Sequence, residues 1–492
     1  DDHQDDIIAH ELFHHWFGDL VTCESWANLP LNESFATYGE YIWREKGFGR
    51  MEADMHLDAD LKNYLRESKS KKVDMIRFDY IDKEDMFDNH SYAKGGRILH
   101  MLRHYLGDDA FYNGLKKYLN DNAYNSVEIH QLRIAMEAIS GEDLNWFFNQ
   151  WFLASGHPKL VIDYYYDNNK KQQIVNIEQI QDQSNTNIYR LPFAIDVYVD
   201  GKAQRHLMEM NQKKQKFVFN VNKEPSNVIV DAEHMLLAEI FDEKSDNSWL
   251  EQMNAPLYMD SKIALENISE KSSSQAVIQA LKSDFWGIRL IGIKKASKLK
   301  NNKEFLGIIE QHAQNEENTK VKSAALRLLS NLDNKNEYLP LLELATKEQS
   351  LLVAGSGLRG LAKLDAEKAL ALAPNFENDL KNVVNEIYAN YGGPDKAFYF
   401  QKLFLNSSGY DLYYLTRDYT TFLKNQELSV ILNGTLVLEK ASEDAKSWMI
   451  SVSQYYLRDI KSTITELYKI EKNKELKKKA NETLERIEDL LK

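Results

Sequence analysis

The sequence predicts a mainly α-helical, multidomain protein, and three observations point to this class. Its 492 residues exceed what a single hydrophobic core supports, so roughly three domains are expected. Helical patterns fill residues 1–156 and 246–492, whereas residues 157–245 carry a run of strand patterns. The predicted order is therefore a helical domain, a small β-sandwich and a C-terminal domain of helical repeats.

The first region, residues 1–156, is predicted to consist of helices packed around large aromatic side chains. Several of the helical patterns end at a glycine, a residue that readily takes the left-handed backbone conformation with which many helices end. The clearest patterns cover residues 5–17, 32–47, 94–107 and 145–156.

The middle region, residues 157–245, changes to short runs of β-branched and aromatic residues separated by polar turns. Several runs alternate apolar and polar residues with period two, as a strand with one buried face does. Five runs carry the pattern: PKLVIDYYYDN, QQIVNIEQIQ, LPFAIDVYVDG, KFVFNVN and NVIVDAE. So many strands in so short a region predict a small β-sandwich.

The last region, residues 246–492, contains a repeat. Three similar segments begin at Ile288, Val321 and Val353, a spacing of 32 or 33 residues, and each ends on a leucine (Leu299, Leu332 and Leu364). A fixed period of this size is typical of stacked helical hairpins. The period is shorter than in most HEAT or armadillo units, so the region is predicted to be a HEAT-like helical superhelix.

Composition excludes some functions. A net charge of −14 argues against a nucleic-acid partner. The sequence contains no run of 18 or more apolar residues, so it predicts no membrane-spanning helix. We expect a soluble protein whose single cysteine, Cys23, fits either a cytoplasmic or a periplasmic location. The chain starts with DDHQDD and no Met, so we expect a piece of a longer protein whose targeting segment would precede Asp1. The oligomeric state stays open.

The stretch that carries chemistry is IAHELFHHWFGDLVTCESWANLPLNESFATYGEY, which begins at Ile8. On a helix, His10 and His14 are about one turn apart, so both imidazoles project from one face and can hold one metal ion. Glu11 lies beside them, placed to touch a metal-bound water rather than the metal. This H-E-x-x-H arrangement is that of zinc peptidases.

A second predicted helix follows and has Glu33 near its start. Catalytic zinc usually has three protein ligands and leaves a fourth position for water. Glu33 can supply the third ligand from this neighbouring helix, so the sequence predicts one Zn²⁺ per chain, held by His10, His14 and Glu33.

With these residues the chain resembles the zinc aminopeptidases of the aminopeptidase N family, which includes leukotriene hydrolase. The family pattern is H-E-x-x-H, eighteen residues and then E, and His14 and Glu33 have that spacing. The resemblance extends over the whole chain in domain order and implies that residues 1–156 are the helical part of a thermolysin-like catalytic domain. It also implies peptide substrates, with Glu11 as the general base.

A second motif, SYAKGGRILHML, resembles the Y-x-K-G segment of the same family. The resemblance assigns to Tyr92 a hydrogen bond to the tetrahedral intermediate. A phenol suits this role because it is a neutral donor that can meet an oxyanion without competing for the metal. Thr37, one turn after Glu33, is a candidate for orienting a histidine ligand, and Lys94 either positions the loop of Tyr92 or is solvated.

The match to the family is incomplete in one respect. The family recognises the α-ammonium of its substrates with the glutamate of a G-x-M-E-N segment, and no such segment occurs in this chain. Aminopeptidase activity is therefore the leading hypothesis, and activity of this chain on its own is left open. Two alternatives stay open as well: a helical-repeat scaffold with a catalytically idle zinc site, and a zinc endopeptidase.

Overall fold

The computed structural model describes residues 5–184, 186–296, 302–332, 335–405, 407, 409–443 and 447–492. The chain forms two compact units, Asp1–Ala296 and Ser297–Lys492. Within the described residues, no helix combines the length and the apolar character needed to cross a membrane. The predicted class, mainly α and multidomain, is confirmed.

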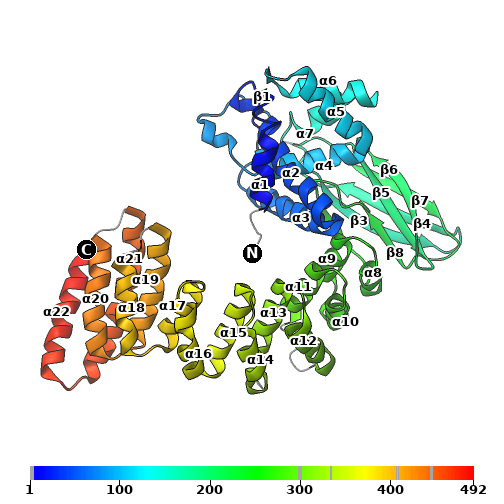
Figure 1. Ribbon diagram of the computed structural model, residues 1–492. Helices are drawn as coiled ribbons and strands as arrows, with labels where there is room; N and C mark the ends of the chain where they lie inside the picture. The colour runs from blue at the N-terminus through cyan, green and yellow to red at the C-terminus, as the bar shows by residue number, and fades with distance from the viewer. Residues whose placement is uncertain are drawn as a thin grey trace. The chain divides into compact units, whose positions relative to one another are not determined.

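The first unit starts with a bundle of helices, and Figure 1 shows α1 alongside α2. A short π-helix, His90–Lys94, leads directly into α4, and a two-stranded parallel sheet joins β1 (Thr22–Cys23) to β2 (Ser126–Val127). The helices are α1 (Asp5–His14), α2 (Pro30–Phe48), α3 (Arg50–Glu67), α4 (Gly95–Leu106), α5 (Asp108–Asp121), α6 (Ile129–Ser140) and α7 (Asn145–Trp151).

Two glycines allow other segments to pack closely against α2. A Cβ atom on Gly39, within α2, would overlap the ring of Phe13 on α1. A Cβ atom on Gly95, at the start of α4, would overlap the side chain of Ser34 on α2. The backbones therefore approach more closely at these two points than any larger residue would permit. Ser34 also donates a hydrogen bond of 2.7 Å to the carbonyl oxygen of Ser91, which ties α2 to the π-helix.

Two sheets follow the helices and share a core. The larger has the order β7-β4-β3-β9 and the smaller β6-β5-β8; only the β3–β9 pair is parallel. The strands are β3 (Lys159–Asp167), β4 (Gln172–Gln179), β5 (Leu191–Val199), β6 (Lys202–Met210), β7 (Lys214–Asn220), β8 (Asn227–Val230) and β9 (Glu239–Asp242). The sequence pattern missed β6, whose side chains are mostly exposed, and β9, which has four residues.

One hydrophobic core joins the helices to the sandwich. Phe17 and Phe35 from the helical part belong to the same buried cluster as Ile162 and Val197 from the two sheets. Four further helices complete the first unit: α8 (Asp246–Gln252), α9 (Tyr258–Asn267), α10 (Glu270–Leu281) and α11 (Trp286–Lys295).

The second unit is helical in its described residues. Val321 lies in α13 and Val353 in α15; these two helices pack together, and Ser323 and Ser356 join them by a hydrogen bond of 2.6 Å. Ile288 lies in α11 of the first unit, and Leu299 lies outside the described residues. The helices are α12 (Lys303–Asn315), α13 (Thr319–Leu329), α14 (Leu339–Ala345), α15 (Leu351–Leu364), α16 (Ala366–Leu372), α17 (Lys381–Tyr391), α18 (Ala397–Leu405), α19 (Gly409–Lys424), α20 (Leu428–Glu443), α21 (Ser447–Ile470) and α22 (Lys474–Leu490).

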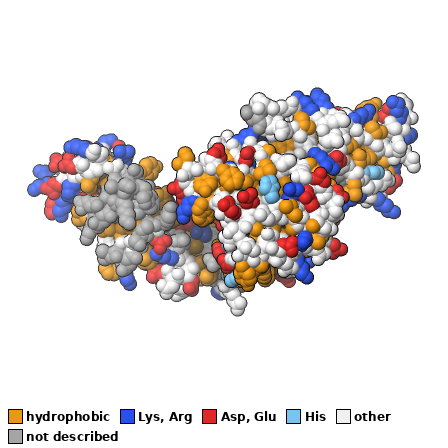
Figure 2. All heavy atoms as spheres, turned by 90° about the horizontal axis from the view of Figure 1, so that it is seen from above, with side chains coloured by type: hydrophobic (Ala, Val, Ile, Leu, Met, Phe, Trp, Pro, Cys, Tyr) orange, Lys and Arg blue, Asp and Glu red, His pale blue; other side chains and the backbone are white. Residues whose placement is uncertain are grey.

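Charge is mixed on the face of the molecule that Figure 2 shows. On the face shown in Figure 2, acidic and basic side chains are interspersed and hydrophobic side chains lie between them. Such a mixed distribution differs from the clustered basic stripe by which proteins bind nucleic acid.

Candidate metal centre

Three side chains from two helices converge at the site. His10 and His14 lie on α1, and Glu33 lies in the first turn of α2. The Oε2 atom of Glu33 is 3.3 Å from Nε2 of His10 and 3.4 Å from Nε2 of His14. One potential ligand atom from each residue lies within 4.8 Å of the other two. The structure thus brings together the three residues that the sequence predicts as metal ligands.

The other nitrogen of each imidazole faces an acceptor. Nδ1 of His10 lies 2.8 Å from Oε1 of Glu40 on α2, and Nδ1 of His14 lies 3.1 Å from the carbonyl oxygen of Phe17. Each of these contacts favours the tautomer with the proton on Nδ1. The lone pairs on the two Nε2 atoms then face the carboxylate of Glu33.

This arrangement needs a positive charge at its centre. Two nitrogen lone pairs and a carboxylate oxygen are all acceptors, so only a proton or a cation between them is favourable. Burial opposes charge on His10, but hydrogen bonds with Glu33 and Glu40 outweigh it and raise its pKa to about 9. Burial likewise opposes charge on Glu33, yet hydrogen bonds with His10 and His14 lower its pKa to about 2. The donor set fits zinc, which takes imidazole nitrogen and carboxylate oxygen.

Tyr92 and Glu11 border this cluster. The Tyr92 ring is parallel to the imidazole of His10, with ring centroids 6.0 Å apart. Burial, and then the negative charge of Glu33, raise the pKa of Tyr92, so its phenol stays protonated near neutral pH. Glu11 is exposed on α1, and its charge also acts on Tyr92, which places it near the same face of the site.

Thr37 is buried on α2, with 5% of its surface exposed. Its hydroxyl has no hydrogen-bond partner in the structure, and its methyl group faces Gly96 of α4. The histidines are instead contacted by Glu40 and by the Phe17 carbonyl, neither of which was predicted from the sequence. A signal for Glu40 exists, since it lies two helical turns after Glu33 and therefore on the same side of α2.

Behind Glu40 lies a cluster of charged groups. Oε2 of Glu40 is 2.9 Å from Nε2 of His56 on α3, and His56 is 3.9 Å from the carboxylates of both Asp6 and Asp60. Arg44 forms a salt bridge with Asp6. Burial raises the pKa of Asp60 to about 7. Glu40 is therefore fixed on both sides, by His10 in front and by His56 behind.

A second group with metal-ligand spacing, Glu67, Asp88 and His90, lies in the same unit. The carboxylate of Asp88 is already neutralised, at 2.7 Å from Arg77 and 2.5 Å from Lys71. His90 Nδ1 is 2.8 Å from Glu67. Because Asp88 already pairs with two cations and His90 with Glu67, the group forms a salt-bridge network.

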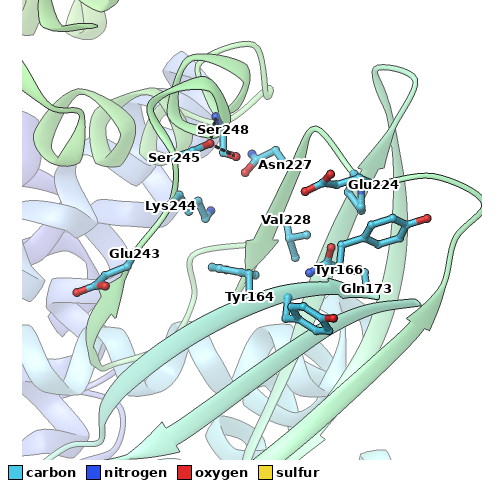
Figure 3. Close-up of a pocket in the computed structure, with 12 residues that line it drawn as sticks. Tyr164, Tyr166, Gln173, Glu224, Asn227, Val228, Glu243, Lys244, Ser245 and Ser248 are labelled. Atoms are coloured by element: carbon cyan, nitrogen blue, oxygen red, sulfur yellow. Dashed lines mark hydrogen bonds between the residues drawn. The ribbon is translucent and has the colours of Figure 1, made fainter. Parts of the chain in front are cut away.

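A cavity of about 200 Å³ lies at one end of the β-sandwich (Figure 3). Tyr164, Tyr166, Asn227 and Lys244 are among its lining residues. None of the residues predicted for catalysis or metal binding lines it, so this cavity is separate from the candidate metal centre.

Comparison with known proteins is consistent with this geometry. Residues 2–151 match the peptidase family M1 domain. "Probable aminopeptidase 1" of Sulfurisphaera tokodaii is 30% identical over 219 residues, 43% of this chain and 27% of the relative. Aminopeptidase N of Lactococcus lactis is 35% identical over 162 residues, 31% of this chain and 19% of the relative. These alignments span about a quarter or less of each relative.

A solved structure resembles nearly all of the chain. The aminopeptidase A of Legionella pneumophila, determined in complex with aspartic acid, aligns with a TM-score of 0.61 over 98% of this chain and 65% of that protein, at 19% identity. This likeness supports the fold. The match of residues 2–151 and the aminopeptidase relatives support the resemblance to the aminopeptidase N family that the sequence predicts.

Proposed function

We propose that this chain carries the catalytic centre of a zinc-dependent aminopeptidase that removes residues from the amino end of peptides. The observation that carries the proposal is the convergence of His10, His14 and Glu33 on one point, with the backs of both imidazoles held by acceptors. The match of residues 2–151 to the peptidase family M1 domain and the aminopeptidase names of the relatives support it. We also propose that the chain has three domains, residues 1–156, 157–245 and 246–492.

The residues of the chain have distinct roles in the proposed reaction. A zinc ion bound by His10, His14 and Glu33 would supply Lewis acidity toward a water molecule and the scissile carbonyl. Glu11 accepts the proton of the attacking water and returns it to the leaving amine. Tyr92, which keeps its proton because its pKa is raised, donates a hydrogen bond to the oxyanion.

The test compares the parent with Glu11→Gln on peptides that have a free amino end. Both proteins are expected to bind one zinc ion, and the variant is expected to lose roughly a hundred- to ten-thousandfold in kcat, which is what general acid–base catalysis contributes. Equal turnover by the two proteins would refute the role of Glu11.

The same assay separates the two other candidate functions. Cleavage of amino-blocked peptides at internal bonds would indicate an endopeptidase, which needs no free α-ammonium. Zinc binding without turnover of any peptide would indicate a scaffold with an idle site. The helical repeats favour the scaffold, because such arrays present extended binding surfaces. The enzyme is favoured because the three candidate metal ligands occur together with Glu11 and Tyr92.

A further inference from the structure

A second cavity, of about 320 Å³, lies within the first unit. Helices α3, α4 and α9, strands β8 and β9 and the loop between these strands contribute to its walls. Here α9 packs against α3 (Figure 1). None of the candidate metal ligands or catalytic residues lines this cavity. We call it the junction cavity, and it is separate from the candidate metal centre.

The junction cavity has a buried guanidinium group in its wall. Arg97 of α4 lines the cavity and is 5% exposed. Its Nη2 atom donates hydrogen bonds to the carbonyl oxygens of His234 and Leu236, at 2.9 and 2.8 Å. Its Nε atom is buried without a hydrogen-bond partner, and no carboxylate among the described residues forms a salt bridge with Arg97. A guanidinium group keeps its charge in proteins, so its burial without a counter-ion is unfavourable.

The other cations that line the junction cavity are paired. Lys62 and Lys262 both form salt bridges with Asp58, at 3.2 and 3.0 Å. His234 contacts Asp260 at 2.6 Å. Of the lining cations in the part of the chain that the structure describes, only Arg97 therefore lacks a carboxylate partner.

The acidic residues that line the junction cavity are also satisfied by other groups. Asp231 is buried near Arg97, and it accepts hydrogen bonds from the backbone N–H groups of Met235 and Leu236, at 3.2 and 2.9 Å. The remaining acids form salt bridges: Glu239 with His157 and Lys159, Asp242 with Lys244, and Glu266 with Lys62 and Lys262. These acids are therefore not free to neutralise Arg97.

Apolar side chains form much of the rest of the wall. Phe241 and Ile240 of β9 line the cavity and are 47% and 37% exposed, so the cavity reaches from the buried Arg97 to the surface. Leu61 of α3 and Ile263 of α9 line it as well, and both are half-buried. A concave site with apolar walls and a few polar groups is typical of small-molecule binding.

We propose that the junction cavity binds a monocarboxylate with an apolar tail. The carboxylate pairs with Arg97, whose planar fork of N–H groups matches the two carboxylate oxygens. The tail lies along the walls and covers the exposed surface of Phe241 and Ile240. At about 30 Å³ for each non-hydrogen atom, the share of one water molecule in the liquid, the cavity holds roughly ten such atoms. Octanoate has this size.

The first experiment measures which ligand chemistry the full, zinc-loaded chain prefers. Isothermal titration calorimetry gives the dissociation constants of octanoate, hexanoate and octylammonium. Octanoate is expected to bind most tightly, and hexanoate roughly tenfold more weakly, because each buried methylene contributes about threefold to fourfold. Equal or tighter binding of octylammonium would show that the acidic residues of the wall outweigh Arg97, and would overturn the inference.

The second experiment tests Arg97 itself. Arg97→Met keeps a long side chain but removes the donors, and is expected to weaken octanoate binding roughly ten- to a hundredfold, the size of hydrogen bonds between charged groups. Arg133→Met is the control, because Arg133 of α6 pairs with Glu137 and does not line the cavity. It should bind octanoate as the parent does. Unchanged binding in Arg97→Met would place the carboxylate elsewhere, such as on the zinc ion, and the inference would be wrong.

A third experiment leaves Arg97 and its two backbone hydrogen bonds in place. Ile263→Trp fills the cavity from α9 and is expected to abolish octanoate binding. Ile139→Trp, at a position of α6 that is 41% exposed, is the control and should keep it. Circular dichroism shows whether each variant is folded. Octanoate binding retained by folded Ile263→Trp, lost equally in Ile139→Trp, or absent from the parent would overturn the inference.

Discussion

At the scale of single residues, Glu40 has the clearest supporting role. It contacts the back of His10 at 2.8 Å and is itself contacted by His56 at 2.9 Å. A carboxylate in this position fixes the tautomer and the orientation of a histidine ligand. His56 in turn holds the carboxylate in place, so the orientation of His10 depends on residues from α2 and α3.

Substitution of Glu40 is therefore expected to weaken metal binding. Glu40→Gln should lower zinc affinity about ten- to a hundredfold, because the amide is a poorer acceptor for the imidazole N–H. Competition with a zinc chelator measures the affinity. Glu24→Gln, at an exposed position of the same unit, is the control and should bind zinc as the parent does. Unchanged affinity in Glu40→Gln would contradict the role given to Glu40.

Lys94 is a buried lysine whose effect on stability should depend on pH. It is fully buried, its Nζ has no hydrogen-bond partner in the structure, and it lies 5.6 Å from the ring centroid of Tyr64. Of the two readings that the sequence left open for it, the solvated one is excluded. Burial lowers the pKa of Lys94 to about 7, from 10.5 for an ordinary lysine.

The sign of the pH dependence follows from this shift. Between pH 7 and 10.5 the unfolded chain binds the proton and the folded chain does not, so the free energy of unfolding rises with pH over this range. Lys94→Met removes the buried charge. It should stabilise the protein on the order of a few kcal/mol below pH 7, with a gain that vanishes toward pH 10.5.

Urea unfolding of the parent and Lys94→Met at several pH values measures this gain. Lys46→Met, at an exposed position on α2, should show no comparable gain. If Lys94→Met stabilised the protein by the same amount at every pH, burial would not lower the pKa of Lys94.

Two kinds of residue could be predicted from the sequence: those whose relative positions are set within one helix, and those that belong to a long sequence motif. His10 and His14 share a helix, so their common face follows from helical geometry alone. Glu40, His56 and the Phe17 carbonyl were not predicted, because their roles depend on how α1, α2 and α3 pack. That packing places His10 and Glu40 together across 30 residues of sequence.

At the scale of elements, the contact between α1 and α2 brings the candidate metal ligands together. Gly39 makes the contact possible, since Phe13 occupies the space that a Cβ atom would need. Gly39→Ala is expected to cost about 1–3 kcal/mol of stability and to weaken zinc binding, because it forces the helices that carry His10 and Glu33 apart.

The same helix offers a matched control. Gly47, also on α2, has open space where a Cβ atom would lie, with no neighbouring atom within 4 Å of that position. Gly47→Ala should therefore stabilise the protein by about 0.5–1 kcal/mol through helix propensity. Thermal unfolding and zinc affinity of the two variants show whether the close contact of α1 and α2 is required for stability and zinc binding. Equal behaviour of Gly39→Ala and Gly47→Ala would show that the close approach of α1 and α2 is not needed.

At the scale of the whole molecule, the candidate metal centre and its supporting residues all lie in the first compact unit. One core there joins the helices to the β-sandwich across the predicted boundary at 156/157, since Phe17 and Ile162 belong to the same buried cluster. Strand patterns could indicate that a sandwich exists, but they carry no information on which helices share its core.

A fragment of residues 1–296 is therefore expected to fold and to bind zinc with the affinity of the full chain. Circular dichroism and chelator competition on the fragment measure both properties. A fragment that folds but binds zinc more weakly would show that the second unit contributes to the site.

The central claim is that His10, His14 and Glu33 bind one zinc ion per chain, and metal analysis of purified variants tests it most directly. The parent and His15→Ala, which removes a neighbouring imidazole that is 67% exposed, are expected to contain one zinc ion per chain. His14→Ala is expected to contain almost none after dialysis. Zinc retained in full by His14→Ala, or absent from the parent supplied with zinc, would contradict the account.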